Sequence, residues 1–398
     1  METKKVNRRN FFRWSATAGA GALLFPNVAA STGDVSSGSK TNEKEYPTRV
    51  LGRTGLEVPI LSMGVMRADN PNVVRAAYEA GLTFFDTAHG YQGGRNEEML
   101  GKFFRDKPRD SFKIATKGKF GYPLGENFEK EFTALLDKSL KRLEMDYVEI
   151  FYIHAIRDVE SIEDERVVRL LQKFREDGKI RHIGISTHAN KPEQIDAAVR
   201  AGIYDVVLLS YNFKLPNLKE TDEAIERGVE AGLGFVAMKT MTGGAEDAEG
   251  KKKINARACL KWVWQNKNIA TIIPGFTNFT EFEECLAAVR QPELTDAERK
   301  YLAMLCEREL LYCLQCGKCR EACVEHLPVP DIMRAYMYAY GYKNAGLAKE
   351  TLLELNLAGK TCANCGKNCR VKCTSGFDVP SKIAAIMPVM QVPDVFLT

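Results

Sequence analysis

Four residues that could together donate a proton to an oxygen follow short apolar segments of this sequence. Asp86 and Tyr91 lie in FFDTAHGYQGG, Lys117 in KIATKG and His154 in IFYIHA. A tyrosine has an ordinary pKa of about 10, so it is a weak acid that can protonate a developing alkoxide. We expect a nearby lysine to lower this pKa, an aspartate to hold the lysine and a histidine to orient a carbonyl group. The set predicts an oxyanion site with a proton donor.

A second group of reactive side chains is a run of cysteines: eight of the 11 fall between Cys313 and Cys373. The first four have the spacing C-x2-C-x2-C-x3-C of bacterial ferredoxins, and the second four have C-x2-C-x3-C-x3-C. Four thiolates so close together can hold one 4Fe–4S cluster, so we expect two clusters. Zinc, which in a ribbon needs two widely separated cysteine pairs, and disulfides are the alternatives. The expected ligands are Cys313, Cys316, Cys319, Cys323, Cys362, Cys365, Cys369 and Cys373.

Alternating strand-like and helix-like segments over residues 46–290 must position the first group. Eight short apolar segments read as strands, and amphipathic patterns such as residues 128–143 read as helices between them. Eight such units fit a (β/α)8 barrel of about 250 residues; a doubly wound open sheet would require a G-x-G-x-x-G turn after the first strand, where none occurs. Residues 49–58 read as a hairpin at the bottom of the barrel. The expected strands are 59–65, 82–87, 112–116, 147–153, 180–186, 205–211, 234–239 and 270–273.

Residues 46–290 resemble the aldo-keto reductase family. The motifs that carry the resemblance are RVLGRTGLEVP, FDTAHGYQGGRNEEMLG, IATKG, DYVEIFYIHA, IGISTH and TIIPGFTNFTEFEECL. The resemblance implies that Tyr91 is the proton donor, that Lys117 and Asp86 tune it and that His154 orients the substrate. It also implies hydride transfer between a nicotinamide cofactor, NAD(H) or NADP(H), and a small carbonyl or alcohol substrate.

The resemblance also indicates a cofactor end of the barrel, at the ends of its later strands. Ser186 matches the family's serine that binds the carboxamide of the nicotinamide. Gly275 and Glu281 stand where many relatives have a lysine and an arginine that hold a ribose 2′-phosphate. A carboxylate suits a free 2′-hydroxyl instead, so we expect NAD(H) or no strong preference; backbone amides of residues 275–278 and the following helix could still hold phosphate. The expected cofactor-binding residues are Ser186, Asn212, Lys239, Gly275, Asn278 and Glu281.

The tail, residues 296–398, resembles the helical ferredoxin-like module found behind some bacterial aldo-keto reductases. We expect an all-α domain with helices at 331–342 and 347–358, after a helix that a capping box at Thr295 and Glu298 opens. In such modules each run gives three ligands to one cluster and its fourth to the other, which implies that Cys323 and Cys373 cross. The clusters would relay electrons to a redox partner protein or brace the fold.

The first 30 residues resemble a twin-arginine export signal. The pair Arg8-Arg9 is followed by an apolar stretch at 16–30 that ends in Val-Ala-Ala, a small-x-small cleavage pattern. Residues 31–45 read as a linker. The pattern predicts passage through the twin-arginine translocase, which carries folded proteins, and a periplasmic location. A cytoplasmic enzyme with an uncleaved basic tail is an alternative.

Composition narrows the remaining classes of function. The net charge of +4 is small, and no basic stripe with interleaved aromatic residues is present, which argues against a nucleic-acid binder. No apolar run reaches the 18 residues of a membrane span, so we expect no stable membrane span. Because nicotinamide is not expected to diffuse freely in the periplasm, the alternative function is an electron-transfer or scaffold protein whose barrel no longer uses it.

Overall fold

The computed structural model describes residues 46–156, 158–244, 246, 252–308, 310–320, 322–357, 362, 365, 369, 371–373 and 376–397. The expected export signal, 1–30, and linker, 31–45, lie outside these residues.

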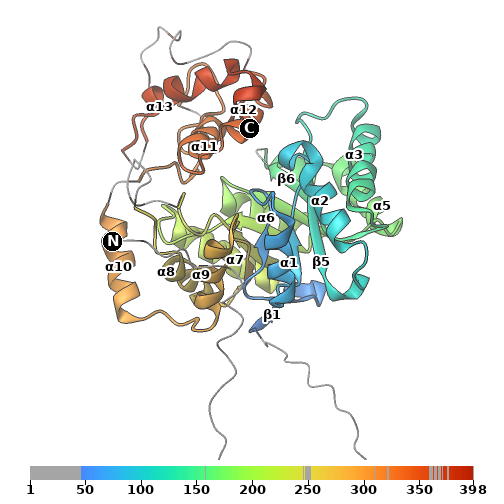
Figure 1. The fold of residues 1–398 in the computed structure, drawn as a ribbon. Coiled ribbons are helices and arrows are strands. Elements are labelled where there is room, and N and C mark those ends of the chain that lie inside the picture. Colours follow the sequence, from blue (N-terminus) through green and yellow to red (C-terminus); the bar gives the residue numbers. More distant parts are fainter. Residues whose placement is uncertain are drawn as a thin grey trace, which may run out of the picture. The chain divides into compact units, whose positions relative to one another are not determined.

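Eight parallel strands form one sheet whose order, from β3 to β10, follows the sequence (Figure 1). The two ends of the sheet also meet, because Leu61, just before β3, bridges Ile272 of β10, and the N–H of Ser62 donates to the Ile272 carbonyl at 2.9 Å. The sheet is therefore a barrel and not an open doubly wound sheet. Its strands are β3 (Met63–Gly64), β4 (Phe84–Asp86), β5 (Lys113–Gly118), β6 (Val148–Ile156), β7 (Ile180–Thr187), β8 (Val206–Ser210), β9 (Gly234–Met238) and β10 (Ile269–Ile272).

At least one helix follows each strand and covers the outside of the barrel. The longest, α3 (Phe128–Leu143), shows why these segments are helical: its buried side chains recur every three or four residues, so they share one face. The other helices of the barrel are α1 (Pro71–Glu79), α2 (Arg95–Phe104), α4 (Glu160–Glu163), α5 (Glu165–Glu176), α6 (Lys191–Ala201), α7 (Leu218–Glu230), α8 (Ala256–Gln265) and α9 (Phe279–Val289), with the short 3-10 helix η4 (Arg109–Ser111) before β5.

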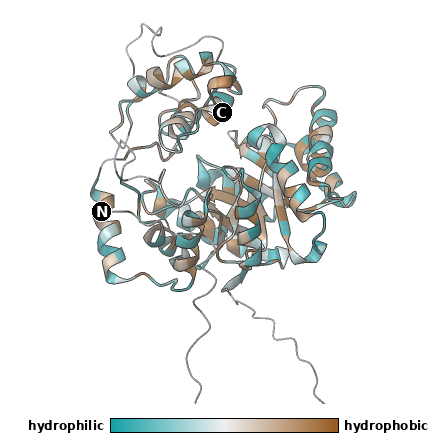
Figure 2. Cartoon of the chain, viewed as in Figure 1, coloured by the Kyte–Doolittle hydropathy of each residue, from teal (hydrophilic) through white to brown (hydrophobic). Residues whose placement is uncertain are grey.

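Two apolar cores explain why the strands are nearly continuous in hydrophobic residues. In β8, Val206 and Leu208 pack inside the barrel, while Val207 and Leu209 pack in the core that includes the surrounding helices. Since strand side chains alternate between the two faces, a strand buried on both sides must be apolar at every position. Figure 2 shows hydrophobic residues on the strands and hydrophilic residues on the outer helices.

A hairpin covers the N-terminal end of the barrel, as the sequence predicts. It consists of β1 (Thr48–Val50) and β2 (Glu57–Pro59), with the 3-10 helix η2 (Gly52–Thr54) between them. Leu51 is fully buried in the inner core. Gly52, at φ +52°, lies so close to Gly234 that a Cβ would come within 2.3 Å of the Gly234 nitrogen. The opposite end of the barrel is left for the site.

The described part of the tail is helical and has a core of its own. The capping box of Thr295 and Glu298 opens α10 (Asp296–Glu307), and α11 (Val329–Tyr340), α12 (Ala345–Leu353) and α13 (Val379–Ile386) follow. The short 3-10 helices η6 (Met387–Gln391) and η7 (Asp394–Phe396) come last. Apolar residues of α11, α12 and α13 pack together, among them Ile332, Leu352 and Ile383. The two helices expected at 331–342 and 347–358 are present, each beginning and ending a few residues earlier, whereas α13 was not expected.

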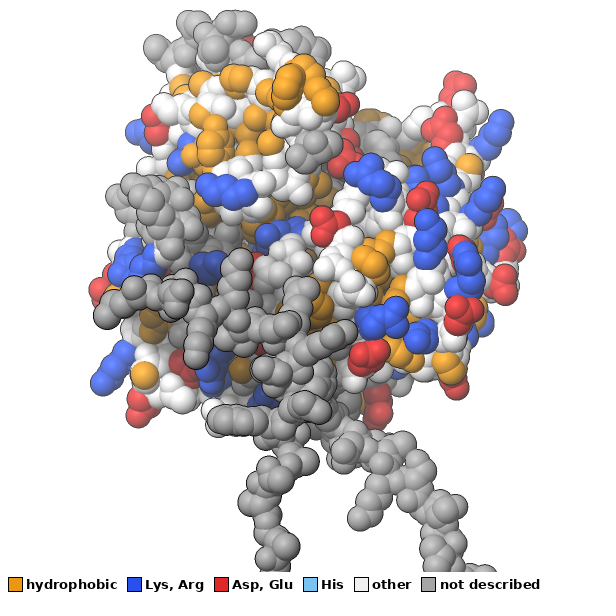
Figure 3. All heavy atoms as spheres, in the orientation of Figure 1, with side chains coloured by type: hydrophobic (Ala, Val, Ile, Leu, Met, Phe, Trp, Pro, Cys, Tyr) orange, Lys and Arg blue, Asp and Glu red, His pale blue; other side chains and the backbone are white. Residues whose placement is uncertain are grey.

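The surface mixes charges of both signs on the face that Figure 3 shows, and hydrophobic side chains gather over the C-terminal helices. Exposed apolar residues there include Tyr340, Leu353 and Phe396. Of the helices that the structure describes, none combines the length and the apolar character that crossing a membrane requires.

Candidate active site

The four residues expected to carry the chemistry lie at the carboxyl ends of three neighbouring strands. Asp86 is the last residue of β4, Lys117 lies in β5 and His154 in β6, and Tyr91 begins η3 (Tyr91–Gly94), the turn after β4. The rings of Tyr91 and His154 meet edge to face, with centroids 5.6 Å apart. The Lys117 Nζ lies 5.1 Å from the centroid of the Tyr91 ring. The structure therefore brings all four together.

A buried ion pair forms the floor of this group. The Nζ of Lys117 donates to the Asp86 carboxylate and, at 2.5 Å, to the carbonyl of Thr87. Lys117 is 1% exposed and Asp86 3%. Burial raises the pKa of Asp86 and lowers the pKa of Lys117, while the attraction between the two groups opposes both shifts. Each group is the other's counter-charge, so neither can be removed without leaving a buried charge.

The phenol and the imidazole above this pair are both held in their neutral forms. Burial, and then the Asp86 carboxylate, raises the pKa of Tyr91 well above its ordinary value. Burial, and then the Lys117 ammonium, lowers the pKa of His154 well below its ordinary value. The net pKa of Tyr91 is thus raised and not lowered, as the nearby lysine led us to expect, because burial and the Asp86 carboxylate outweigh the Lys117 ammonium. Tyr91 is therefore a protonated group that can donate.

Residues of α2 and α3 fix the turn that carries Tyr91. The Asn96 side chain donates to the Val65 carbonyl at 2.7 Å and accepts from the Thr87 hydroxyl at 2.7 Å. Arg142 donates to the carbonyl of His89 at 2.9 Å and pairs with the fully buried Glu97 at 3.2 Å. Sequence reasoning missed these positioning residues, although their polar side chains interrupt otherwise apolar helix faces.

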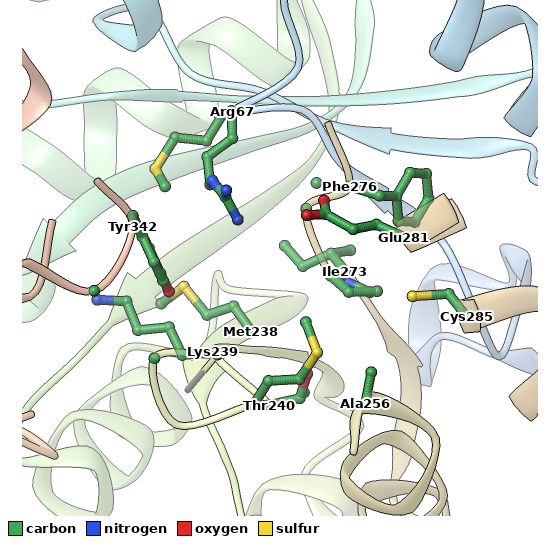
Figure 4. Close-up of a pocket in the computed structure, with 18 of the residues that line it drawn as sticks. Arg67, Met238, Lys239, Thr240, Ala256, Ile273, Phe276, Glu281, Cys285 and Tyr342 are labelled. Carbon is green, nitrogen blue, oxygen red and sulfur yellow. The ribbon is translucent and has the colours of Figure 1, made fainter. Parts of the chain in front are cut away.

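One cavity of about 380 Å³ connects the residues around Tyr91 with the residues expected to bind the cofactor. Asp86, Tyr91 and His154 line it, and so do Gly275 and Glu281, which the sequence assigns to the cofactor. Figure 4 shows Arg67 and Glu281 pointing into this cavity. No sequence motif indicated Arg67, which follows the first strand of the barrel.

Several buried polar atoms at the ends of β7 and β9 have no hydrogen-bond partner within the described part of the chain. They are the Ser186 Oγ, the His188 Nδ1, the Lys239 Nζ and the Thr240 Oγ1. Buried polar groups are normally paired, because leaving one unpaired costs about 1–3 kcal/mol. A cluster of unpaired donors and acceptors is therefore suited to a polar ligand. Ser186 and Lys239, two of the residues expected to bind the cofactor, are in this cluster.

Asn212 differs from the other expected cofactor residues. Its amide donates to the Lys239 carbonyl at 3.1 Å and accepts from the backbone N–H of Lys214 at 3.1 Å. The side chain thus ties the loop after β8 to the loop after β9, so its role in the structure is to brace the loop that carries Lys239.

The side-chain carboxylate of Glu281 lies at the N-terminal end of its own helix, α9. Its carboxylate accepts from the backbone N–H of Thr277 at 2.9 Å and from the Thr277 hydroxyl at 3.1 Å. Asn278 is the N-cap of the helix and accepts from the Glu281 N–H at 3.0 Å. A helix N-terminus favours an anion, and here a carboxylate of the same helix supplies one. Gly275, beside them, would bring a Cβ within 3.3 Å of the Gly64 carbonyl.

The tail also contributes to the cavity. Tyr338 of α11 and Tyr342 just after it line the cavity together with Tyr91. The Arg67 guanidinium lies 5.2 Å from the centroid of the Tyr342 ring, and the Lys239 Nζ lies 5.2 Å from that of Tyr338. The two tyrosines are stacked, 5.7 Å apart. Part of the wall around Tyr91 therefore comes from sequence more than 240 residues away, which no local pattern indicates.

The comparison with protein families decides the identity of the barrel. Residues 61–258 match the model of the aldo/keto reductase family. The chain carries an aldo/keto reductase domain. With the residues above in place, the protein is an NAD(P)-dependent oxidoreductase of the aldo-keto reductase type.

Individual relatives agree with this assignment. L-galactose dehydrogenase of Arabidopsis thaliana is 28% identical over 298 residues, which are 64% of this chain and 92% of that protein. L-glyceraldehyde 3-phosphate reductase of Escherichia coli O157:H7 is 30% identical over 187 residues, 43% of this chain and only 51% of the relative. The holo form of an aldo-keto reductase from Bacillus halodurans has the same fold, with a TM-score of 0.55 and 20% identity over 66% of this chain and 96% of its own.

Beyond the aldo/keto reductase domain, the eight cysteines of the tail fall into two sets. Cys373 lies with the first run and Cys323 with the second, so the two runs exchange their last cysteine. Among the residues that the structure describes, no group of three or more His, Cys, Asp or Glu side chains surrounds a position for a metal ion. The set that lines one small cavity is Cys313, Cys316, Cys319 and Cys373. The set that lines the other is Cys323, Cys362, Cys365 and Cys369.

Proposed function

We propose that this protein is an exported aldo-keto reductase that moves a hydride between NAD(H) and a small carbonyl or alcohol substrate, and that its tail holds two 4Fe–4S clusters. The observation that carries the catalytic part is the packing of a neutral phenol and a neutral imidazole over the Lys117–Asp86 pair.

The residues of the site divide the chemistry of carbonyl reduction between them. Tyr91 donates its hydroxyl proton to the carbonyl oxygen as a hydride reaches the carbonyl carbon, and the product is an alcohol. The neutral His154 binds the same oxygen and orients it. Lys117, held by Asp86, places a positive charge beside the ring of Tyr91 and stabilises the phenolate that the transfer leaves. Alcohol oxidation runs the same steps in reverse.

The chain has the groups that a nicotinamide cofactor requires, and when bound the cofactor supplies or accepts the hydride. The unpaired Ser186 hydroxyl at the end of β7 suits its carboxamide, and the unpaired Lys239 ammonium suits its anionic part. NAD(H) fits better than NADP(H), because the Thr277 N–H and hydroxyl are already bound by the Glu281 carboxylate, which would repel a 2′-phosphate.

Two clusters fit the cysteine sets of the tail better than single metal ions do. A zinc ion requires its donors within about 2.3 Å of one point, whereas a four-iron cluster is larger and is gripped from several sides by thiolates. Each small cavity of the tail is lined by four cysteines, three from one run and one from the other. The clusters would relay single electrons or brace the tail.

Small hydroxylated carbonyl compounds are the first substrates to test. The relative that this chain covers almost completely is named as an L-galactose dehydrogenase. The cavity also combines aromatic side chains, Tyr338 and Tyr342, with polar ones such as Lys239 and Thr240, and hydroxyl groups of a sugar can hydrogen-bond to the latter.

Replacement of Tyr91 by phenylalanine tests the proposed chemistry, because it removes the proton donor and keeps the shape of the ring. We expect the rate of aldose turnover with NAD(H) to fall by about 10²–10⁴-fold, while the Kd for NADH, measured by fluorescence quenching, stays within about twofold. Activity within a few-fold of wild type would contradict the role of Tyr91. If the wild-type protein binds no nicotinamide at all, the result supports the alternative function, an electron-transfer or scaffold protein.

A further inference from the structure

Two buried lysines of the barrel face the tail and are not needed by the proton transfer. Lys239 follows β9, and its Nζ is buried without a hydrogen-bond partner within the described part of the chain. Lys191 is the first residue of α6 and is 1% exposed. A buried ammonium group is costly unless a counter-charge is close. Asp331, the acidic side chain that acts on Lys239, also pairs with Arg334 at 2.8 Å.

The tail segment that faces these lysines is the first cysteine run. A Cβ at Gly317 would come within 2.4 Å of the Asn190 Oδ1, so the backbone of Gly317 is packed on Asn190. Gly317 follows Cys316, and Asn190 precedes Lys191. The ring of Tyr312, beside Cys313, is packed equally closely on Gly243, in the loop that begins with Lys239. Two independent contacts therefore press this run onto the loops after β7 and β9.

The electrostatic environment agrees with the packing. Burial lowers the pKa of Lys191 to about 8, and the strongest opposing influences are Cys316 and Cys313. For Lys239, burial and the Arg334 guanidinium lower the pKa, and Cys313 is the strongest influence that raises it. Cysteines of the first set are thus the groups that most strongly oppose the lowering of both lysine pKa values.

We propose that Lys191 and Lys239 are the counter-charges of the cluster held by Cys313, Cys316, Cys319 and Cys373, and that they raise its reduction potential. This inference rests on the cluster assignment made above. Four thiolates make such a cluster an anion, and a one-electron reduction adds a further negative charge. A fixed positive charge nearby stabilises the reduced form more than the oxidised form, and net charge is one of the factors that set these potentials.

The two cysteine sets differ in their position relative to the cofactor end of the barrel. Ser186 lies four residues before Asn190, and Lys239 lines the same cavity as Tyr91. The cysteine set that contains Cys313 is therefore the one at the cofactor end of the barrel. Its cluster would be the first in any transfer of electrons between the barrel and the tail, and the set that contains Cys362 would be second.

The test is a redox titration of the full-length holoprotein, followed by electron paramagnetic resonance, with dithionite as reductant. Lys191→Met is the main variant, because Lys191 does not line the catalytic cavity and methionine has a similar length. We expect one of two titration components to shift to more negative potential, with a change of about tenfold or more in the reduction equilibrium, which is about 59 mV for one electron. Lys239→Met should move the same component in the same direction.

Two further variants serve as controls. Lys191→Arg keeps the charge and should leave the potential near that of the wild type. Lys219→Met removes a lysine of α7 whose side chain is 86% exposed, where water and salt screen its charge, so it should shift the potential much less. Unchanged potentials in both buried-lysine variants, with the iron content intact, would overturn the inference. A wild-type protein without iron would instead overturn the cluster assignment, and this inference with it.

Discussion

Removal of Lys117 should destabilise the protein far more than removal of an ordinary surface lysine. In Lys117→Met, the Asp86 carboxylate keeps its 3% exposure but loses its cation, and the Thr87 carbonyl loses a donor. Breaking a buried pair in this way costs about 3–5 kcal/mol of unfolding free energy. Asp86→Asn leaves the ammonium without its counter-charge and should cost a similar amount.

The double variant distinguishes this explanation from a simple loss of packing. With both charges gone, neither is left unpaired, so the double variant should be more stable than the sum of the single losses predicts, by about 2–3 kcal/mol. Urea unfolding followed by circular dichroism measures all four proteins. Lys119→Met is a matched control on the same strand end, because Lys119 pairs with Glu354 in a partly exposed position and should cost no more than about 1 kcal/mol.

The pH dependence of the same variant has a definite sign. Without Lys117, only the burial that raises the pKa of Asp86 remains, so the folded-state pKa lies above the unfolded value of about 3.9. The contribution of Asp86 to the free energy of unfolding is then greatest at low pH and is lost as the pH rises through the folded-state pKa. The deficit of Lys117→Met should therefore be smaller at about pH 5 than at about pH 8. Additive single losses, or a deficit that grows at low pH, would refute the buried ion pair.

Four further predictions concern the catalytic groups, the cofactor, the tail and the proposed export signal. Burial raises the pKa of Tyr91 and lowers that of His154, so both side chains stay neutral between about pH 6 and pH 9. The rate of carbonyl reduction should therefore not change with pH over this range. A titration near neutral pH in the rate profile would show that Lys117 lowers the pKa of the phenol after all. Fluorescence titration should give a Kd for NADH equal to or below that for NADPH, and Glu281→Gln should narrow the difference; a hundredfold preference for NADPH, about 2.7 kcal/mol, would show that another cation of the cavity holds the phosphate. Protein purified without air should contain about eight irons with equal acid-labile sulfide, and Cys316→Ser should lose half of them, whereas zinc in place of iron would reject the clusters. Lysines in place of the arginine pair near the N-terminus should keep the loaded protein in the cytoplasm.

The convergence of the candidate catalytic residues could be predicted from the sequence, because the fold brings the ends of its strands together. In a parallel barrel the carboxyl ends of the strands meet at one face, so Asp86, Lys117 and His154 had to converge once their segments were recognised as strands. The direction of the shift in the Tyr91 pKa could not be predicted in the same way. It depends on the burial of Tyr91, to which the tail residues of the same cavity contribute. It also depends on the ion pair between Lys117 and Asp86.

The parts of the site that the sequence did not indicate arise from contacts between distant segments. Tyr338 and Tyr342 read as ordinary members of an amphipathic helix, and only the packing of the tail on the barrel brings them beside Tyr91. Helix α13 is a different case, since its signal was present: Asp378 is an N-cap residue before a proline in the first turn. Its shortness hid the pattern, because eight residues give only two turns of periodicity.

The exchange of Cys323 and Cys373 between the two runs has a consequence for the assembly of the whole enzyme. The chain between the runs carries α11, and α11 carries a side chain that forms part of the cavity wall beside Tyr91. If the proposed clusters fill the cysteine sets, each of them closes the same long loop around this helix. Insertion of the clusters and completion of the substrate site would then be one linked equilibrium. By reciprocity, a substrate that needs the finished wall should also favour the loaded tail. Such an enzyme would remain inactive until its iron–sulfur clusters were inserted, and its activity would therefore indicate that cluster insertion was complete.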